Sequence, residues 1–165
     1  MRIVLEGCDG TGKSTLAQIL SYKYNLDTCH CGRTDPSDYD FYKNSIRKDN
    51  IVWDRHVIGE LIYPEIFGRD GHIDAESARL VVCYGREVNT KFIILTCDSH
   101  IIGDRLNARG TEDSRILDNY VEINRKFLHY ADLFDIPVID TTKLTLPEIF
   151  DLVEAEVKYH RFIHK

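Results

Sequence analysis

The sequence predicts an α/β fold with three layers, in which a five-stranded parallel sheet is flanked by helices on both faces. Three observations support this prediction. Short, continuously apolar runs alternate with segments that repeat apolar residues at helical spacing, as expected for strands buried between crossover helices. A glycine-rich segment joins the first strand to the first helix. The chain has 165 residues and 43% of them are hydrophobic, so we expect one domain over residues 1–165 with a sizeable core.

Each expected strand is a short apolar or β-branched run between polar or turn-forming residues. In chain order, the strands are expected at residues 2–6, 28–31, 51–53, 91–97 and 136–140. The second of these runs is the least apolar, and the fourth is the clearest. Because parallel strands end at the same edge of a sheet, we expect the residues that follow these runs to lie close together.

Helices are expected between the strands, where apolar residues recur every three or four positions. They are expected at residues 13–24, 38–47, 57–67, 75–87, 99–108, 116–134 and 147–159. Asn25-Leu26-Asp27 ends the first helix, Gly32-Arg33-Thr34-Asp35-Pro36 is a loop, and Gly68-Arg69-Asp70-Gly71 ends the third helix. Asp74 suits the N-cap of the fourth helix, and Pro147 suits the first turn of the last one.

Residues 7–14 read Gly-Cys-Asp-Gly-Thr-Gly-Lys-Ser and match G-x-x-x-x-G-K-[ST], the phosphate-binding P-loop motif. The strand before the motif and the helix after it predict a P-loop NTPase fold. The glycines let backbone N–H groups point at one anion, and the helix N-terminus adds its positive dipole. In this motif the lysine, Lys13, reaches the β- and γ-phosphates of ATP, and Ser14 binds Mg²⁺. The residues expected around the ATP phosphates are Gly7, Cys8, Asp9, Gly10, Thr11, Gly12, Lys13, Ser14 and Thr15.

Polar residues follow each of the expected strands. They are the P-loop, Arg33 with Asp35, Asp54 with Arg55, Asp98, and Thr141 with Lys143. Ligands of parallel α/β sheets bind beyond the carboxyl ends of the strands. We therefore expect a phosphate site at this edge, where the positive charge of an acidic protein is concentrated locally.

The composition excludes several classes of protein. A net charge of −6 argues against a general nucleic-acid binder and against a protein that binds anionic membranes. No stretch approaches the ~18 apolar residues of a membrane span. Five cysteines, an odd number, and no secretory leader before the first strand favour reduced thiols in the cytoplasm. We interpret Cys29-x-Cys31 as buried strand cysteines; a metal site is the alternative, but no second Cys/His pair lies at zinc spacing.

Three groups of residues resemble thymidylate kinase and its nucleoside-monophosphate-kinase relatives. They are Glu6-Gly7-x-Asp9-Gly10-x-Gly12-Lys13-Ser14-Thr15, Asp54-Arg55 and Arg105-x-x-x-Arg109-Gly110. The tail is similar too: Val138-Ile139-Asp140 is followed by a helix that starts near Pro147-Glu148. Together these motifs occur in the family's order and span nearly the whole chain. The resemblance implies transfer of the ATP γ-phosphoryl group to a nucleoside monophosphate, with Mg²⁺ as cofactor and small nucleotides as partners.

The resemblance also implies a role for each group. Ser14 and Asp54 hold the metal, although Asp54 has the alternative of a strand-end cap. Asp9 approaches the acceptor's sugar, and Arg55 binds the acceptor's phosphate with a planar guanidinium; a surface salt bridge is its alternative. The residues expected to take part in catalysis are Lys13, Asp9, Asp54, Arg105 and Arg109.

A lid is expected at residues 105–115. Gly10 follows Asp9 where some family members carry arginine, and such enzymes supply the catalytic arginine from the lid. Arg105 and Arg109 lie four residues apart on one helix face, and Arg115 is a third candidate. The alternative interpretation of this segment is a solvated charged loop.

Further positions follow the family less closely. Thr141, Thr142 and Lys143, together with Arg105, lie where the family's adenine loop falls. Acceptor contacts are expected from Asp9, Arg33, Asp54, Arg55 and Tyr63. Tyr63 best matches a family tyrosine that could stack on the acceptor base, with a core position as the alternative. The family often forms homodimers through helices, and the apolar face of residues 75–88 is a candidate surface.

The sequence leaves the acceptor open. The family's acceptor segment after the second strand is reduced to Arg33-Thr34-Asp35-Pro36, and His56 stands where thymidylate kinases usually have tyrosine. dTMP is the first candidate, and dGMP, dUMP or a modified deoxynucleotide are the others. Two alternative functions remain: a deoxynucleoside kinase that uses Asp54 as its base, and a non-enzymatic ATP-binding regulatory protein.

Overall fold

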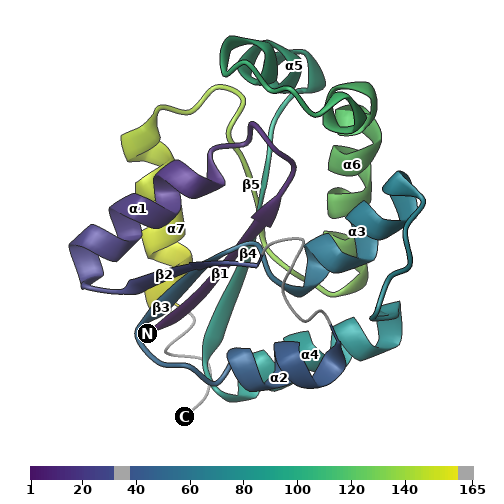
Figure 1. The fold of residues 1–165 in the computed structure, drawn as a ribbon. Helices are drawn as coiled ribbons and strands as arrows, with labels where there is room; N and C mark the ends of the chain where they lie inside the picture. Colours follow the sequence, from purple (N-terminus) through teal and green to yellow (C-terminus); the bar gives the residue numbers. More distant parts are fainter. Residues whose placement is uncertain (32–37, 160–165) are drawn as a thin grey trace.

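A five-stranded parallel sheet forms the centre of the protein, which confirms the predicted fold class (Figure 1). The computed structural model describes residues 1–31 and 38–159. The strands are β1 (Arg2–Gly7), β2 (Asp27–His30), β3 (Ile51–Asp54), β4 (Thr90–Thr96) and β5 (Val138–Asp140). Their spatial order is β2-β3-β1-β4-β5, and every neighbouring pair is parallel. The loop after β1 therefore emerges at the middle of the sheet's carboxyl edge.

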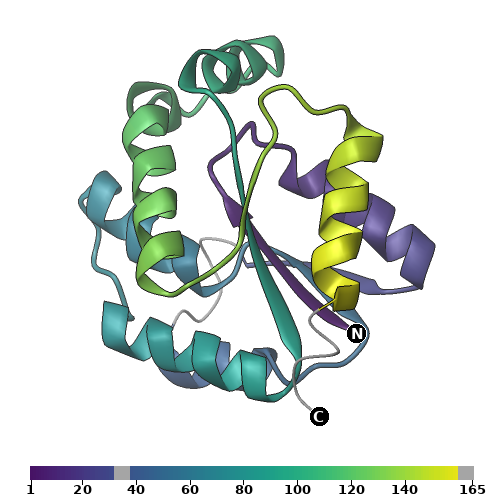
Figure 2. The ribbon, with the colours of Figure 1, turned by 180° about the vertical axis from the view of Figure 1, so that it is seen from behind.

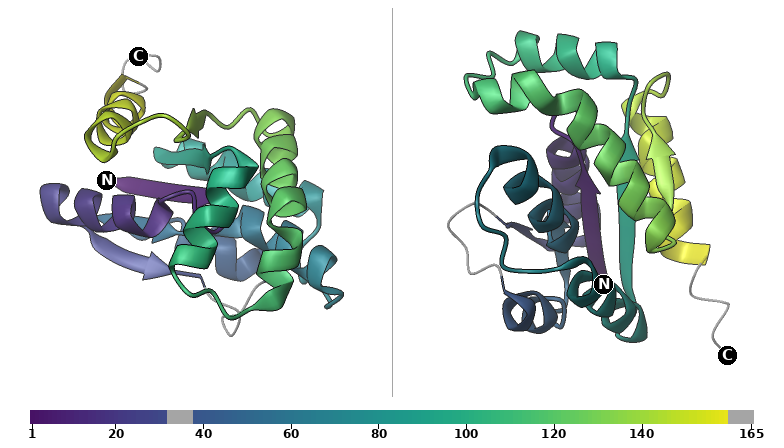
Figure 3. Two further views of the ribbon diagram at one scale, coloured as in Figure 1. Left: turned by 90° about the horizontal axis from the view of Figure 1, so that it is seen from above. Right: turned by 90° about the vertical axis from the view of Figure 1, so that its right-hand side faces the viewer.

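Helices cover both faces of this sheet and complete the three layers. They are α1 (Lys13–Tyr24), α2 (Tyr39–Ser45), α3 (Val57–Phe67), α4 (Ala75–Glu87), α5 (Ser99–Ala108), α6 (Ser114–Leu133) and α7 (Leu146–Tyr159). One face carries α1 and α7, and the other carries α2, α3, α4 and α6 (Figures 1 and 2). Seen from the side, α5 lies beyond the carboxyl edge of the sheet, beside the start of α6 (Figure 3, right).

The side chains of β1 alternate between two apolar cores. Ile3 and Leu5 point toward α1 and α7, where they pack in one core with Leu16. Val4 points to the opposite face and packs in the second core with Trp53 of β3. Because both faces are covered, a strand in this position is expected to be wholly apolar.

Most predicted boundaries lie within one residue of the observed ones, while the end of α2, the start of α6 and the start of β5 each differ by two residues. The helices α1, α3 and α4 begin and end at the predicted residues. β2 begins one residue earlier than predicted and pairs only with β3 within the described residues, so it is an edge strand. Cys29 and Cys31 are consequently only half-buried, which corrects the expectation of buried strand cysteines. All five cysteines lie within the described residues, and none forms a disulfide.

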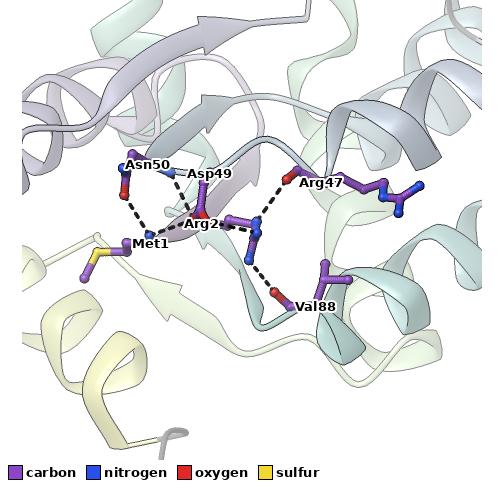
Figure 4. A network of polar contacts seen from close by, with 6 residues as sticks. All are labelled: Met1, Arg2, Arg47, Asp49, Asn50 and Val88. Carbon is purple, nitrogen blue, oxygen red and sulfur yellow. Dashed lines mark hydrogen bonds and ion pairs between the residues drawn. The ribbon is translucent and has the colours of Figure 1, made fainter.

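The amino edge of the sheet is held by a polar network around Arg2 (Figure 4). The Arg2 side chain donates to the carbonyl oxygen of Val88 at 2.6 Å and to that of Arg47 at 3.4 Å. It also pairs with Asp49 at 3.3 Å, and the Met1 ammonium group contacts the same carboxylate at 3.2 Å. This network joins the carboxyl ends of α2 and α4 to the start of β1, at the edge opposite the P-loop.

Over residues 1–31 and 38–159, none of the helices has both the length and the apolar character needed to cross a bilayer.

Candidate active site

The P-loop curls between β1 and α1 in a conformation that requires its glycines. Gly7, Gly10 and Gly12 have φ angles of 137°, 83° and 97°, where L side chains are disfavoured. At Gly7 a Cβ atom would lie only 2.2 Å from the carbonyl oxygen of Leu95, so β4 itself leaves no room for a side chain. Gly12 is the N-cap of α1, and a Cβ atom added there would meet none of the described residues within 4 Å. The loop is therefore open above the helix N-terminus, where a bound anion would lie.

Lys13 lies inside this loop. Its ammonium group donates to the carbonyl oxygen of Cys8 at 2.7 Å, and the residue is only 4% exposed. Burial, together with the positive charge of Arg55, lowers the pKa of Lys13 to about 8, although Asp9 and Asp54 oppose the shift. A phosphate in the loop would add negative charge beside this buried ammonium group and so stabilise its protonated form.

Asp54 ends β3 beside the first turn of α1. Burial raises the pKa of its carboxyl group, but hydrogen bonds with His30 and Ser14 and the charge of Lys13 bring it below the usual value. One carboxylate oxygen, Oδ1, is buried and has no hydrogen-bond partner among the described residues. An unpartnered carboxylate oxygen beside a serine hydroxyl fits an Mg²⁺ ion, which takes oxygen ligands and retains several waters. Ser14 and Asp54 are thus brought together as the sequence predicts.

Asp9, Arg55 and Tyr63 form a polar cluster at the rim of the P-loop. Arg55 pairs with Asp9 Oδ1, and the Tyr63 hydroxyl donates to Asp9 Oδ2 at 3.0 Å. The Arg55 guanidinium lies 4.8 Å from the centre of the Tyr63 ring. Burial raises the pKa of Asp9, but the charges of Arg55 and Lys13 bring this pKa below its ordinary value. The cluster therefore holds an ionised carboxylate and an arginine next to the loop.

Arg55 has an unusual backbone conformation. Its φ angle is +76°, a region that costs a non-glycine residue roughly 1–3 kcal/mol. Its own N–H donates to the carbonyl oxygen of Leu5 at 2.9 Å, which ties the turn to β1. The Nε atom of Arg55 is buried, and no described residue accepts from it. The turn aims a cation with unused donor capacity at the site.

The structure corrects the role expected for Tyr63. The residue is 6% exposed, and its ring packs against Phe67 and Phe127 on one side and Arg55 on the other. These described neighbours leave the ring no open face for an acceptor base, because the i, i+3, i+4 spacing in α3 directs Tyr63 into the core. Its hydroxyl instead positions Asp9.

The segment predicted as a lid, residues 105–115, comprises the end of α5, a short turn and the start of α6. Arg105 donates to the carbonyl oxygen of Gly10 at 3.0 Å, so the first lid arginine touches the P-loop. Arg109 is exposed at the end of α5, and its positive charge contributes to the lowered pKa of Asp9. Arg115 faces elsewhere: it pairs with Asp113 and stacks 4.8 Å from the centre of the Phe67 ring. Arg105 therefore contacts the P-loop, Arg109 acts on Asp9 through its charge, and Arg115 does not join them.

The residues expected at the adenine divide into two kinds. Thr141 is fully buried, and its hydroxyl contacts the carbonyl oxygens of Thr96 and Thr11 at 3.0 and 3.3 Å. Its side chain therefore supports the P-loop from beneath and cannot contact a base, which corrects that expectation. Thr142 is half-buried and accepts from the N–H of Asp98, while the side chain of Lys143 is exposed. Their role at the adenine stays a prediction. Arg33 falls outside the described residues.

The comparisons with known proteins agree with this geometry. A family model described as an AAA domain, AAA_18, matches residues 3–125, which include the P-loop, Asp54-Arg55, Arg105 and Arg109. The chain belongs to this AAA domain family. Among curated proteins, this AAA domain is similar to a probable thymidylate kinase from Methanocaldococcus jannaschii, with 20% identity over 96% of each chain.

Solved structures show the same fold. A YorR protein from Bacillus subtilis, described in complex with phosphorylated GDP, has a TM-score of 0.81 and 19% identity, and the match covers 100% of each chain. Thymidylate kinase from Candida albicans has a TM-score of 0.62 and 17% identity, covering 96% of this chain and 91% of its own. Deoxyadenosine kinase from M. mycoides with bound dCTP has a TM-score of 0.62 and 16% identity, covering 96% and 100%. The AAA domain thus has a P-loop kinase fold.

One buried residue of this AAA domain received no role of its own from the sequence. Glu6 lies in the central strand, and its carboxylate accepts hydrogen bonds from the backbone N–H groups of His56 and Ile58 at 3.0 and 2.8 Å. The sequence did indicate a structural role for Glu6, because a glutamate at the end of an otherwise apolar buried strand must find hydrogen-bond partners inside the protein.

Proposed function

We propose that this protein is a kinase that transfers the γ-phosphoryl group of ATP to a (deoxy)nucleoside monophosphate, with dTMP as the first acceptor to test. The observation that carries the proposal is the position of the Arg55 side chain. Its guanidinium is held at the rim of the P-loop by Asp9, and its buried Nε donor has no partner in the described part of the chain. Lys13 and the loop amides suffice for one nucleotide's phosphates, so a further arginine at the rim suits a second phosphate.

Each part of the site has a role in such a transfer. Lys13 and the backbone amides of the P-loop hold the β- and γ-phosphates of ATP, and Ser14 and Asp54 would hold Mg²⁺. When bound, Mg²⁺ neutralises and orients those phosphates. Arg55 holds the acceptor's phosphate in line with the γ-phosphate, which is most of what phosphoryl transfer asks of a protein. Arg105 and Arg109 stabilise the charge that develops between the two nucleotides.

The similar proteins support this proposal and also suggest the main alternative, a deoxynucleoside kinase. The similar proteins include a probable thymidylate kinase and a thymidylate kinase, which favour dTMP. They also include a deoxyadenosine kinase with a TM-score equal to that of the C. albicans thymidylate kinase, which favours a nucleoside as acceptor. The complex of the YorR protein with phosphorylated GDP makes dGMP a necessary member of any acceptor series.

The test is an ADP-release assay with ATP, Mg²⁺ and each common nucleoside monophosphate, run in parallel with the matching nucleosides. We expect turnover with a monophosphate and none with its nucleoside. Phosphorylation of thymidine or deoxyadenosine without activity on any monophosphate would establish the rival kinase. ADP release equal to that with water alone, for every acceptor, would establish an ATP-binding protein without kinase activity.

The Arg55→Ala variant tests the role of the arginine within this assay. It should raise the KM for the monophosphate about 10- to 100-fold, because a charge-assisted hydrogen bond contributes ~1.5–3 kcal/mol. The KM for ATP should change much less. Arg125→Ala is the matched control, since Arg125 is an exposed arginine of α6 that pairs with Glu122. Equal increases in both KM values would remove Arg55 from acceptor binding.

A further inference from the structure

Glu6 is the one carboxylate among residues 1–31 and 38–159 that is buried, with 1% of its surface exposed. Its Oε1 atom accepts the N–H of His56 at 3.0 Å and that of Ile58 at 2.8 Å. Its Oε2 atom is buried, has no partner among those residues and lies beside Gly59, where a Cβ atom would be 3.7 Å away. A charge in this position is costly, and burial raises its pKa to about 7 despite the two amides.

The two N–H groups that donate to Glu6 belong to the start of α3. The first backbone N–H groups of a helix have no partner within the helix, and a side chain at the N-cap usually satisfies them. Here the N-cap residue is His56, whose side chain makes no cap hydrogen bond within the described structure. Glu6 supplies the missing acceptor from a different element, the central strand β1.

Arg55 lies immediately before these two amides. Its left-handed φ of +76° is held on one side by its own N–H, which donates to the carbonyl oxygen of Leu5. On the other side it is held by the bond from the His56 N–H to Glu6. The strained turn is therefore fixed between two consecutive residues of β1, and the next residue of that strand, Gly7, begins the P-loop.

We infer that Glu6 is a positioning residue: its carboxylate fixes the turn at residues 55–58 against β1 and so holds Arg55 at the distance from the P-loop that an acceptor phosphate requires. The inference rests on the proposed function for its kinetic consequence. A cap for α3 alone would need only a serine, threonine or aspartate at position 56. A buried glutamate directly before the P-loop, in contrast, links the ATP-phosphate loop and the acceptor arginine through one side chain.

The kinetic test compares wild type with Glu6→Gln and Glu6→Ala. Gln keeps the shape and one acceptor atom but loses the charge, and it places an NH₂ group where none of the described residues offers an acceptor. We expect Glu6→Gln to raise the KM for the monophosphate about tenfold, equivalent to ~1.4 kcal/mol, with little change in the KM for ATP. Glu60→Gln is the matched control, because Glu60 is in the first turn of the same helix and pairs with Arg69 at 3.8 Å. Its KM values should equal those of wild type.

A second readout does not depend on kinase activity. The Nε–H resonance of Arg55 is followed by NMR while inorganic phosphate is added to wild type, Glu6→Gln and Glu60→Gln. We expect phosphate to shift this resonance in wild type and in Glu60→Gln, at several-fold lower concentration than in Glu6→Gln. This result would support the positioning role even if no monophosphate is a substrate. If Glu6→Ala does not fold, Glu6→Gln carries both tests.

Two results would overturn the inference. One is a Glu6→Gln protein with a lowered Tm but with the wild-type ratio of the two KM values and the wild-type response of Arg55 to phosphate, which would make Glu6 a purely structural cap. The other is a wild-type Arg55 resonance that phosphate does not shift, which would mean that no anion site exists for Glu6 to position.

Discussion

Burial of His56 should make the stability of the protein depend on pH. The imidazole is 1% exposed, its Nε2 lies 2.8 Å from the Ser45 hydroxyl, and its Nδ1 is buried without a partner among the described residues. The ring meets Tyr42 and Trp53 edge to face, at centroid distances of 4.9 and 5.1 Å. Burial lowers the pKa of His56 to about 3, from 6.5 in the unfolded chain.

The direction of the effect follows from proton binding. Between pH 3 and 6.5 the unfolded chain protonates this histidine and the native state does not, so the free energy of unfolding falls as the pH falls. The loss is ~1.4 kcal/mol per pH unit, or ~2 kcal/mol between pH 6.5 and 5. Glu6 acts in the opposite direction: its pKa is raised from 4.5 to about 7, so its contribution falls as the pH rises through that range. The titration of wild type alone therefore combines two opposing effects.

A comparison with His56→Gln isolates the histidine. Gln places an amide near Ser45 and does not titrate, so its lost packing lowers stability by a similar amount at every pH. Urea unfolding at pH 7.5 and pH 5.0, followed by circular dichroism, should show the advantage of wild type over the variant shrinking by ~2 kcal/mol at the lower pH. An advantage that is the same at both pH values would show that His56 is not held neutral by burial.

Three further predictions concern the site. Arg109→Ala should lower kcat at least ~10-fold with an unchanged KM for ATP, because a lid arginine acts on transition-state charge; an unchanged kcat would remove it from the mechanism. Asp54→Asn should raise the Mg²⁺ concentration needed for half-maximal rate about tenfold or more, and an unaltered Mg²⁺ titration would contradict its assignment as a ligand. Gly7→Ala should lower the free energy of unfolding by more than ~3 kcal/mol, since its Cβ would meet the Leu95 carbonyl. Gly12→Ala has an open Cβ position and should cost only ~1 kcal/mol; equal losses in urea unfolding would refute the steric argument.

Local signals were sufficient for most of the fold. Asp74 accepts the N–H of Ser77 and caps α4 as predicted, and α1 starts directly after Gly12. The spacing of strands and helices also specified the parallel sheet, because continuous apolar strands need cover on both faces. The start of β5 was less well predicted, because Ile136 donates to the carbonyl oxygen of Ala131 and so belongs to the turn after α6, and the strand begins only at Val138.

The direction of individual side chains was harder to predict, because it depends on residues far along the chain. Arg115 stacks on Phe67, which belongs to a different helix, and nothing near Arg115 in sequence indicates this. Thr141 is buried because its hydroxyl meets the carbonyl oxygens of the P-loop and β4. The positive φ of Arg55 likewise depends on β1, whose Leu5 and Glu6 hold both sides of the turn. The sequence therefore indicated which residues meet at the site more accurately than which way each one faces.

The charges around Asp9 give a physical reason to expect a phosphate on the acceptor. Both Asp9 oxygens are occupied, one by Arg55 and the other by the Tyr63 hydroxyl. A neutral nucleoside offers no charge that could compete for Arg55, so it would have to bind with this ion pair intact. A monophosphate carries a dianion that binds a guanidinium more strongly than one carboxylate does, and its arrival at Arg55 would free an Asp9 oxygen to accept a sugar hydroxyl. We therefore expect the acceptor to carry a phosphate and a nearby hydroxyl, as a nucleoside monophosphate does.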